Sequence, residues 1–280
     1  MDNKKATFLV ALSAALFATG GLFFKIIPWD ALAINSGRTL ISGTILFCYM
    51  RLRGRKFKIN KTVILSTLGL IVTNNLYSVA NKLTTAGNTI ILQFTMPVFV
   101  ILIMLIWYKQ KPTKLELGTC ACVLCGIVIF FVDSLSAGHV LGDILAVVSG
   151  IGYAFFFVFS TAEDADSLSS LILSHSCSFL IGLPALLKTD FAATPGSAFA
   201  AFFALAIFQQ ALAQICLSEG FSKTPAVTAS LISGIEPILN PILVAVFWHE
   251  MLSPMALCGA ALVLVSILYY NYRRAKENPE

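Results

Sequence analysis

Ten long apolar runs constrain this chain more than any other feature of its sequence. A bilayer core about 30 Å thick is crossed by about 20 apolar residues in a helix. Backbone groups in lipid must pair within the chain, so runs of this length predict membrane-spanning helices. The composition agrees, because the 280 residues are 58% hydrophobic and only 12% charged, whereas soluble domains are about 25% charged. We therefore predict an all-α polytopic membrane protein with ten transmembrane helices, at residues 6–27, 31–50, 62–82, 86–108, 115–132, 140–160, 168–187, 198–217, 226–248 and 254–272.

The basic residues predict how these helices are oriented. Most of them lie in the segment RLRGRKFKINK at 51–61, in the connection that holds Lys109, Lys111 and Lys114, and near the two termini. With ten spans, all these segments fall on one side, and the side rich in lysine and arginine is cytoplasmic. We therefore expect a protein of the cytoplasmic (inner) membrane with both termini in the cytoplasm. The first run lacks a small-residue cleavage site, so we expect it to be retained as a helix.

Several function classes lack their sequence signals. The net charge of +5 comes from short loops and does not indicate nucleic-acid binding. The seven cysteines fall inside apolar runs and are typical of small buried hydrophobic residues, with no disulfide framework. The chain has no phosphate-binding loop, no HExxH motif and no plausible catalytic triad. We therefore expect no metal, no cofactor and no enzymatic activity.

An internal repeat appears when the chain is shifted by 140 residues. The shift places Pro97 on Pro237, Ala86 on Ala226 and Gln110 on Glu250. It divides the chain into five-helix halves at residues 1–133 and 134–280. Because five is odd, the second half is inverted relative to the first. Inverted repeats are typical of secondary transporters, which bind substrate near the middle of the membrane between the halves.

These features resemble the EamA-type branch of the drug/metabolite transporter superfamily. The resemblance rests on the ten runs, on Arg38 in NSGRTLISG, on the repeated proline, and on FWHE at the end of the ninth run. It implies transport of small metabolites across the cytoplasmic membrane, in many members the export of amino acids or related compounds. Phe17 stands where the first span of many members has a tryptophan.

Polar residues inside the runs indicate where a solute binds. Such residues are costly in lipid and usually face the bundle interior or water. They recur on single helical faces of the third, fourth, eighth and ninth runs, and Tyr153 and Phe17 supply aromatic walls. The alternative is that these amides bond between helices, at about 0.6 kcal/mol per pair. The predicted substrate-binding residues are Asn74, Tyr77, Ser78, Gln93, Tyr153, Gln210, Gln214, Ser233, Glu236 and Asn240.

Glu236 is the most informative of these residues. An ionised carboxylate in mid-bilayer costs at least ~2.5 kcal/mol, and Pro237 and Pro241 each remove a backbone N–H. A helix broken there predicts a cavity where Glu236 binds a substrate amine or exchanges a proton. The alternative is a hydrogen bond to Arg38 or to an amide of the eighth run. His175 is a second candidate for proton coupling.

Other ionisable residues have simpler predicted roles. We expect Arg38 to be structural and to bond helix carbonyls, and Glu219 to form an interfacial ion pair with Lys223.

The sequence therefore predicts a secondary transporter, a monomer or a dimer, that exports a small polar metabolite such as an amino acid or an amine. Two alternatives remain. One is an importer of a quaternary amine such as choline, held in an aromatic cage of Tyr77, Tyr153 and Phe17 by cation–π contacts. The other is a membrane receptor or enzyme that transports nothing.

Overall fold

The computed structural model describes residues 3–109, 111–160, 162, 164–221, 233, 235–249 and 253–277. Within these ranges the regular secondary structure is entirely helical, which confirms the predicted all-helical class. The helices of the first half are α1 (Asn3–Ala18), α2 (Gly20–Ile26), α3 (Ala31–Leu52), α4 (Lys61–Leu83), α5 (Ala86–Gln93), α6 (Met96–Tyr108) and α7 (Lys114–Ala137). Those of the second half are α8 (Val140–Ser160), α9 (Ser167–Leu187), α10 (Gly196–Ala204), the π-helix η1 (Leu205–Leu212), α11 (Ala213–Phe221), α13 (Ile235–Trp248) and α14 (Pro254–Glu277).

Seven helical stretches of the described chain are long and apolar enough to cross a membrane. They match seven of the predicted runs. Helix α14 contains a shorter apolar stretch at Leu257–Tyr270, and α7 and α13 overlap the remaining runs. Residues 226–232 and 234 of the predicted ninth run lie outside the described residues, as do Gln110 and Glu250. The predicted division at residue 133 falls inside α7, which ends near Gly138, a glycine with φ of 76°.

Two runs that the sequence analysis treated as continuous helices are interrupted. The first breaks between α1 and α2, where the Thr19 hydroxyl donates to the carbonyl of Leu16 at 2.7 Å. The run at 86–108 breaks between α5 and α6, where Thr95 donates to the carbonyl of Leu92 at 2.6 Å. Pro97 follows at the start of α6 and has no N–H for the carbonyl of Gln93. At both breaks the threonine N–H and hydroxyl donate to the same carbonyl three residues earlier, in place of the α-helical bond.

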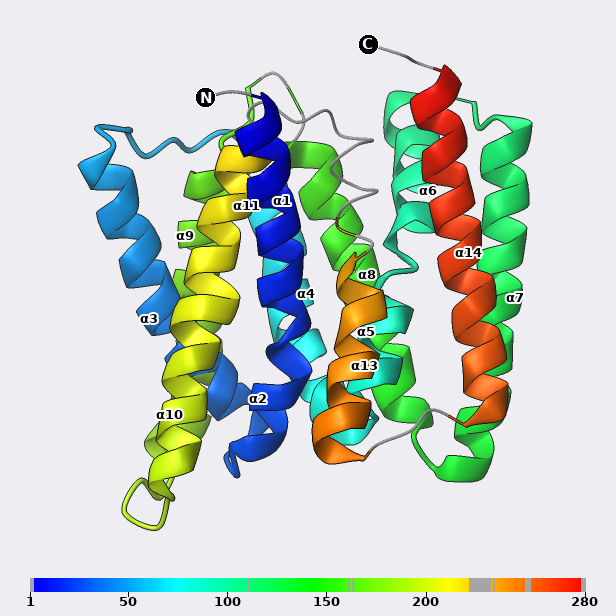
Figure 1. Ribbon diagram of the computed structural model, residues 1–280. Coiled ribbons are helices and arrows are strands. Elements are labelled where there is room, and N and C mark those ends of the chain that lie inside the picture. Colours follow the sequence, from blue (N-terminus) through cyan, green and yellow to red (C-terminus); the bar gives the residue numbers. More distant parts are fainter. Residues whose placement is uncertain are drawn as a thin grey trace.

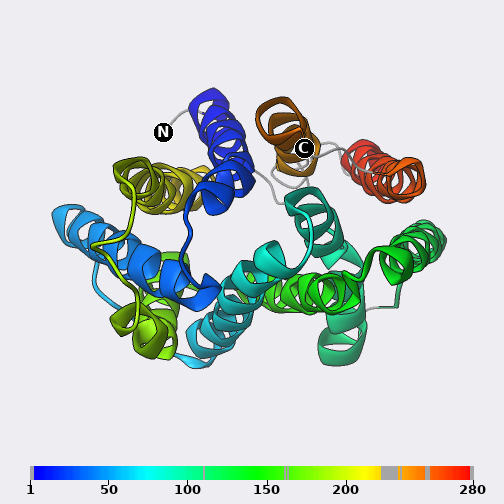
Figure 2. The ribbon, with the colours of Figure 1, turned by 90° about the horizontal axis from the view of Figure 1, so that it is seen from below.

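The helices pack in pairs around a central group, as Figures 1 and 2 show. In the centre, α4 packs against α8 and α1 packs against α11. At one edge of the bundle α3 pairs with α9, and at the other edge α7 pairs with α14. The α4–α8 crossing is closest at Gly69 and Gly152, where an added Cβ would lie 2.5 and 2.6 Å, respectively, from the carbonyl oxygen of the other glycine. Small residues allow such close backbone contact between membrane helices.

Both ends of the chain lie at the same end of the bundle (Figure 1). The loop between α3 and α4 lies at this end as well, with its arginines and lysines. We call this the terminal end and the other the opposite end.

The cysteines depart from the sequence prediction. All seven are free thiols, but only Cys216 is buried, while Cys48, Cys122, Cys125 and Cys258 are exposed. In a membrane-spanning bundle an exposed apolar helix face meets lipid, so a thiol in an apolar run need not lie in the core.

Candidate functional site

A cavity of about 70 Å³ lies among the central helices. Given the volume that one water molecule needs, this cavity has room for roughly five water molecules. Its wall comes from both halves of the chain, including α4 and α8 on one side and η1, α11 and α13 on another. The lining residues are Phe17, Arg38, Leu70, Thr73, Asn74, Tyr77, Gln93, Tyr153, Phe156, Ser167, Leu171, Gln209, Gln210, Gln214, Leu217, Ser218 and Glu236.

Helix α4 contributes much of the predicted polar face. Asn74 and Tyr77 line the cavity. Ser78 lies behind them, donating to the carbonyl of Asn74 at 2.7 Å and accepting from Nη2 of Arg38 at 3.2 Å. Ser78 therefore does not line the cavity but holds the Arg38 side chain in position.

Arg38 of α3 makes structural hydrogen bonds, as the sequence suggested, but to different partners. Its Nε and Nη2 atoms donate to Oδ1 of Asn35 at 3.2 and 3.0 Å, and its guanidinium lies 5.1 Å from the ring centroid of Phe24. The expected bonds to helix carbonyls are replaced by bonds to side chains. Nη1 makes no hydrogen bond to any described residue, and the side chain lines the cavity. Arg38 thus brings a buried positive charge to the site.

Helix α8 forms the aromatic wall and holds the broken helix α5. Tyr153 stacks on Phe156 with centroids 6.0 Å apart. Ser149 accepts a hydrogen bond from Nε2 of Gln93 at 3.2 Å. A Cβ on Gly150 would lie 2.7 Å from the carbonyl oxygen of Gln93, so only glycine allows this approach. The carbonyl left free by Pro97 therefore packs closely on α8.

The π-helix η1 explains why the cavity lining includes a residue that the sequence analysis did not predict. Gln209, Gln210 and Gln214 all line the cavity, although only the last two were predicted. In an α-helix, residues 209 and 214 would point in different directions. The i→i+5 bonding of a π-helix widens the turn, a feature frequent at functional sites, and brings both residues to the cavity. Nε2 of Gln209 also donates to the carbonyl of Phe17 at 3.5 Å.

Four amide side chains in the cavity wall carry polar atoms without partners among the described residues. They are Nδ2 of Asn74 and the Oε1 atoms of Gln209, Gln210 and Gln214. Each buried unsatisfied polar group costs about 1–3 kcal/mol. Such a cost at four neighbouring positions indicates that water or a bound solute completes these hydrogen bonds.

Glu236 lies in the first turn of α13, is 8% exposed and lines the same cavity. Tyr77, Tyr153 and Arg38 line the same cavity as Glu236. Glu236 and Arg38 both lie in the described part of the chain, and no hydrogen bond or ion pair joins them. The Arg38 guanidinium and the Glu236 carboxyl group therefore face the cavity without contacting each other.

Comparisons with known proteins bear on this arrangement. A family model for the EamA-like transporter family matches residues 4–132 and again residues 140–272. The chain belongs to the EamA-like transporter family. It is therefore a multi-pass membrane protein of a transporter family, as the sequence resemblance implied.

Other comparisons give the fold alone or no match. The curated proteins contain no match to this EamA-like transporter. One solved crystal structure aligns over 99% of this chain and 100% of its own, with a TM-score of 0.69 and 17% sequence identity. That likeness supports the fold of this EamA-like transporter and carries no information on its substrate.

The other predicted residues of this EamA-like transporter lie outside the cavity lining. Ser233 is half-buried, and Nδ2 of Asn240 donates at 2.8 Å to the carbonyl of Ala18, at the break between α1 and α2. His175 is buried in α9 with Nδ1 2.7 Å from the carbonyl of Leu171, and its side chain meets Gly43 of α3. Asn240 thus supports a helix break, and His175 belongs to the α3–α9 contact.

Proposed function

We propose that this EamA-like transporter is a secondary transporter that exports a small polar metabolite, an amino acid or an amine-like solute, across the cytoplasmic membrane. The solute binds in the central cavity, and the protein exposes that cavity to one side of the membrane at a time. The observation that carries this proposal is the set of four unpartnered amide atoms in one cavity, together with a guanidinium and a carboxyl group that face it without contacting each other.

The two charges favour a zwitterionic solute. A guanidinium presents a planar fork of donors that matches a carboxylate, and Arg38 has a free Nη1 for it. A carboxylate such as Glu236 binds an ammonium group through charge-assisted hydrogen bonds. An amino acid carries both groups and satisfies both residues, with amide atoms of η1 and α11 completing its polar contacts.

The architecture that we propose for this cycle is ten spans in two inverted five-helix repeats, residues 1–133 and 134–280. The family model matches each half separately, which supports the repeat. The packing also supports it, because span 3 on span 6 (α4 on α8) has its counterpart in span 8 on span 1 (α11 on α1). We also propose that the terminal end, with its basic loops, faces the cytoplasm.

A quaternary-amine importer is the second candidate. Tyr77, Tyr153 and Phe17 all line the cavity, as an aromatic cage requires. Trp107 lies elsewhere, 5.4 Å from the ring of Phe159. Cation–π contacts to a buried cation contribute about 2 kcal/mol, so such a solute would depend more on the rings than on Arg38.

Transport assays with Glu236→Gln test the proposal. The purified protein is first screened by thermal shift against amino acids, amines and quaternary amines, because a ligand of the native state raises its stability by mass action. The best solute is then measured by counterflow in proteoliposomes, where an enzyme or a receptor would give none. Glu236→Gln should fold normally and lose solute affinity or the pH dependence of transport, since glutamine keeps the size but can neither carry charge nor exchange a proton.

The matched control is Asp164→Asn, which removes an exposed carboxylate away from the cavity. Wild-type rates and an unchanged pH profile in Glu236→Gln would reduce Glu236 to a packing residue. Loss of affinity in Arg38→Gln would support the zwitterion, whereas loss only in Tyr77→Leu and Tyr153→Leu would favour the quaternary amine.

A further inference from the structure

The cavity is bounded toward the terminal end by residues of α9 and α11. Ser167 at the start of α9 and Ser218 in α11 both line it, and their hydroxyl oxygens are 3.1 Å apart. Leu171 and Leu217 lie beside them in the cavity wall. These residues of α9 and α11 therefore border the cavity on its terminal side.

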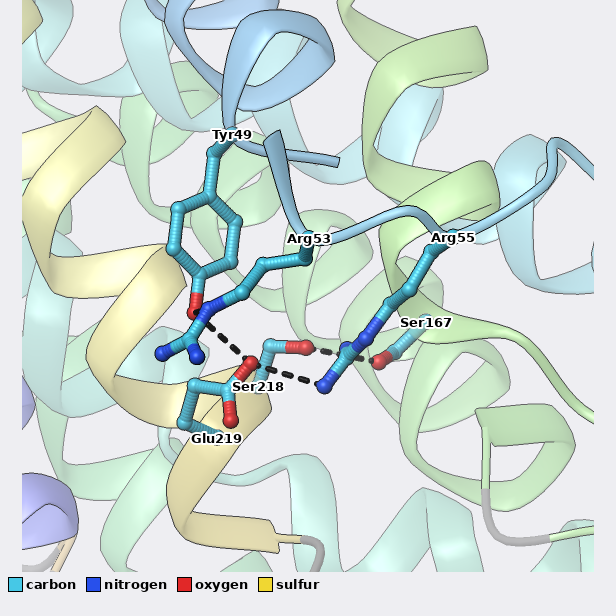
Figure 3. Close-up of polar contacts among 6 residues, drawn as sticks. All are labelled: Tyr49, Arg53, Arg55, Ser167, Ser218 and Glu219. Atoms are coloured by element: carbon cyan, nitrogen blue, oxygen red, sulfur yellow. Dashed lines mark hydrogen bonds and ion pairs between the residues drawn. The ribbon is translucent and has the colours of Figure 1, made fainter. Parts of the chain in front are cut away.

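Figure 3 shows a second set of contacts next to this serine pair. The carboxylate of Glu219 accepts a hydrogen bond from the hydroxyl of Tyr49 at 2.8 Å, and Nη2 of Arg55 lies 2.9 Å from the same oxygen. Nε of Arg53 donates to the hydroxyl of Tyr49 at 3.2 Å. These contacts join the end of α3 and its following loop to α11. The expected partner of Glu219, Lys223, lies outside the described residues.

Both sets of contacts join the same two parts of the molecule. Helix α3 packs along α9, so Tyr49 and Ser167 belong to one packed pair, and Arg55 lies in the loop that follows α3. Ser218 and Glu219 belong to α11, which packs along α1. The serine pair and the glutamate contacts therefore hold the α3–α9 pair against α11 at the terminal end of the cavity.

The chemistry of these contacts suits repeated opening. Side chains of Arg55 and Glu219 are 43% and 16% exposed, and exposed ion pairs contribute little to stability because water replaces them readily. Hydroxyl pairs such as Ser167 and Ser218 exchange with water in the same way. Helices α4 and α8 also share a hydroxyl pair, Ser66 and Ser160, but at their glycine crossing they meet through packed backbone.

We propose that these residues form the terminal-end gate of the transporter, and that separation of α11 from the α3–α9 pair opens the cavity to that side. The role of this gate rests on the proposed transport function. The contacts that form the gate do not depend on that function. Ser167, Ser218 and Glu219 are its central residues.

A disulfide across the gate tests the proposal. Ser167→Cys/Ser218→Cys places two thiols where hydroxyl oxygens now lie 3.1 Å apart. The matched control is Ser66→Cys/Ser160→Cys, because those hydroxyl oxygens are 3.0 Å apart across the fixed α4–α8 pair and outside the cavity lining. Peptide mass spectrometry confirms each crosslink among the native cysteines. Counterflow of a radiolabelled amino-acid mixture should fall at least tenfold in the oxidised gate variant, recover on reduction, and stay within twofold of wild type in the oxidised control.

A labelling experiment tests the gate without any transported solute. Gln214→Cys places a thiol in the cavity wall, and its reaction with a water-soluble thiosulfonate is followed in detergent by peptide mass spectrometry. Adding Glu219→Gln should speed this reaction at least threefold, because the ion pair with Arg55 is lost. Adding Asp164→Asn should leave the rate unchanged.

The outcomes separate the two proposals. Full counterflow in the crosslinked gate variant would overturn the gate, as would equal labelling rates with and without Glu219→Gln. If the wild type moves no amino acid, the proposed substrate fails, and the labelling rates still decide whether the gate exists.

Discussion

The two ends of the bundle are held together by different kinds of contact. At the terminal end, the polar contacts of α11 with the α3–α9 pair are hydroxyl groups and one partly exposed ion pair, and Ile215 of α11 also packs against the buried cluster that contains Met50 and Leu171. At the opposite end, Trp29 is 6% exposed and packs against rings from the α9–α10 segment. Its ring centroid lies 5.2 Å from Phe191, 5.6 Å from Phe199 and 4.9 Å from Phe202.

This difference indicates which end separates at lower cost. A polar contact contributes only about 0.2–1.5 kcal/mol, whereas a buried tryptophan removes about 150–250 Å² from solvent. At roughly 25 cal/mol per Å², re-exposing the aromatic cluster costs several kcal/mol. The polar contacts that join α11 to the α3–α9 pair therefore separate at lower cost than the Trp29 cluster, as the proposed gate requires. The following four predictions test this comparison.

The largest expected effect concerns the side of the membrane that each end of the bundle faces, because a reporter at either end is either active or silent. Reporter domains active only in the cytoplasm are fused at Lys111 and at Pro195, which precedes α10. If the terminal end faces the cytoplasm, the fusion at Lys111 is active and the fusion at Pro195 is silent. Equal activity at both positions would rule out this topology and with it the distinction between the two ends.

Trp29→Ala should destabilise the folded protein most among point variants. Removing a large buried aromatic side chain typically costs about 3–5 kcal/mol, and Nε1 of Trp29 also donates to the hydroxyl of Thr194 at 2.8 Å. The measurement is the free energy of unfolding in mixed micelles. Thr194→Val removes the hydrogen bond alone and should cost only about 1 kcal/mol. A loss below 1 kcal/mol for Trp29→Ala would show that the cluster does not hold this end.

Lys82→Met should have an intermediate effect at the opposite end. Nζ of Lys82 donates to the carbonyl of Ile27 at 2.7 Å and to that of Phe24 at 3.2 Å, at the end of α2. Charged hydrogen bonds contribute about 1.5–3 kcal/mol when buried, and the solvent near this lysine reduces the expected loss to about 1 kcal/mol. Lys82→Arg retains donors and serves as the control. Equal unfolding curves for wild type and Lys82→Met would mean that these bonds contribute nothing.

Arg55→Gln should have the smallest effect on stability. An exposed ion pair contributes about 0.2–1 kcal/mol and is screened by salt. The free energy of unfolding should fall by no more than that, and the difference from wild type should shrink at 1 M salt. A loss of several kcal/mol that persists at high salt would make the terminal end as firmly closed as the other end, and would remove the contrast.

The sequence predicted the helices well because the membrane imposes a length and a composition on each span. The run at 31–50 became α3, Ala31–Leu52, and the run at 62–82 became α4, Lys61–Leu83. The breaks at Thr19 and Thr95 were not predicted, because both depend on local side-chain bonds and the first also on Asn240 from a distant helix. Pro97 could have indicated the second break, since it removes the N–H that would bind the carbonyl of Gln93.

The candidate site was predictable where polar residues repeat on one helical face. Asn74, Tyr77, Gln210 and Gln214 follow the α-helical period and reach the cavity. Gln209 does not follow that period. It reaches the cavity because of the π-helix, which no sequence pattern predicted. Asn240 does follow it but bonds the carbonyl of Ala18. A helical period fixes the face on which a residue lies, and the tertiary packing decides what that face meets.

The α4–α8 crossing also bears on the energetics of a transport cycle. Gly69 and Gly152 leave no space for adjustment between these helices, and Thr73 donates across them to the carbonyl of Ser149 at 3.1 Å. We therefore expect Tyr77 and Tyr153 to keep one mutual geometry through the proposed cycle. A ligand shifts a conformational equilibrium only through a difference in its affinity for the two states. A rigid wall contributes equally to both affinities, so the free energy that couples solute binding to movement must come from the helices facing it, η1, α11 and α13.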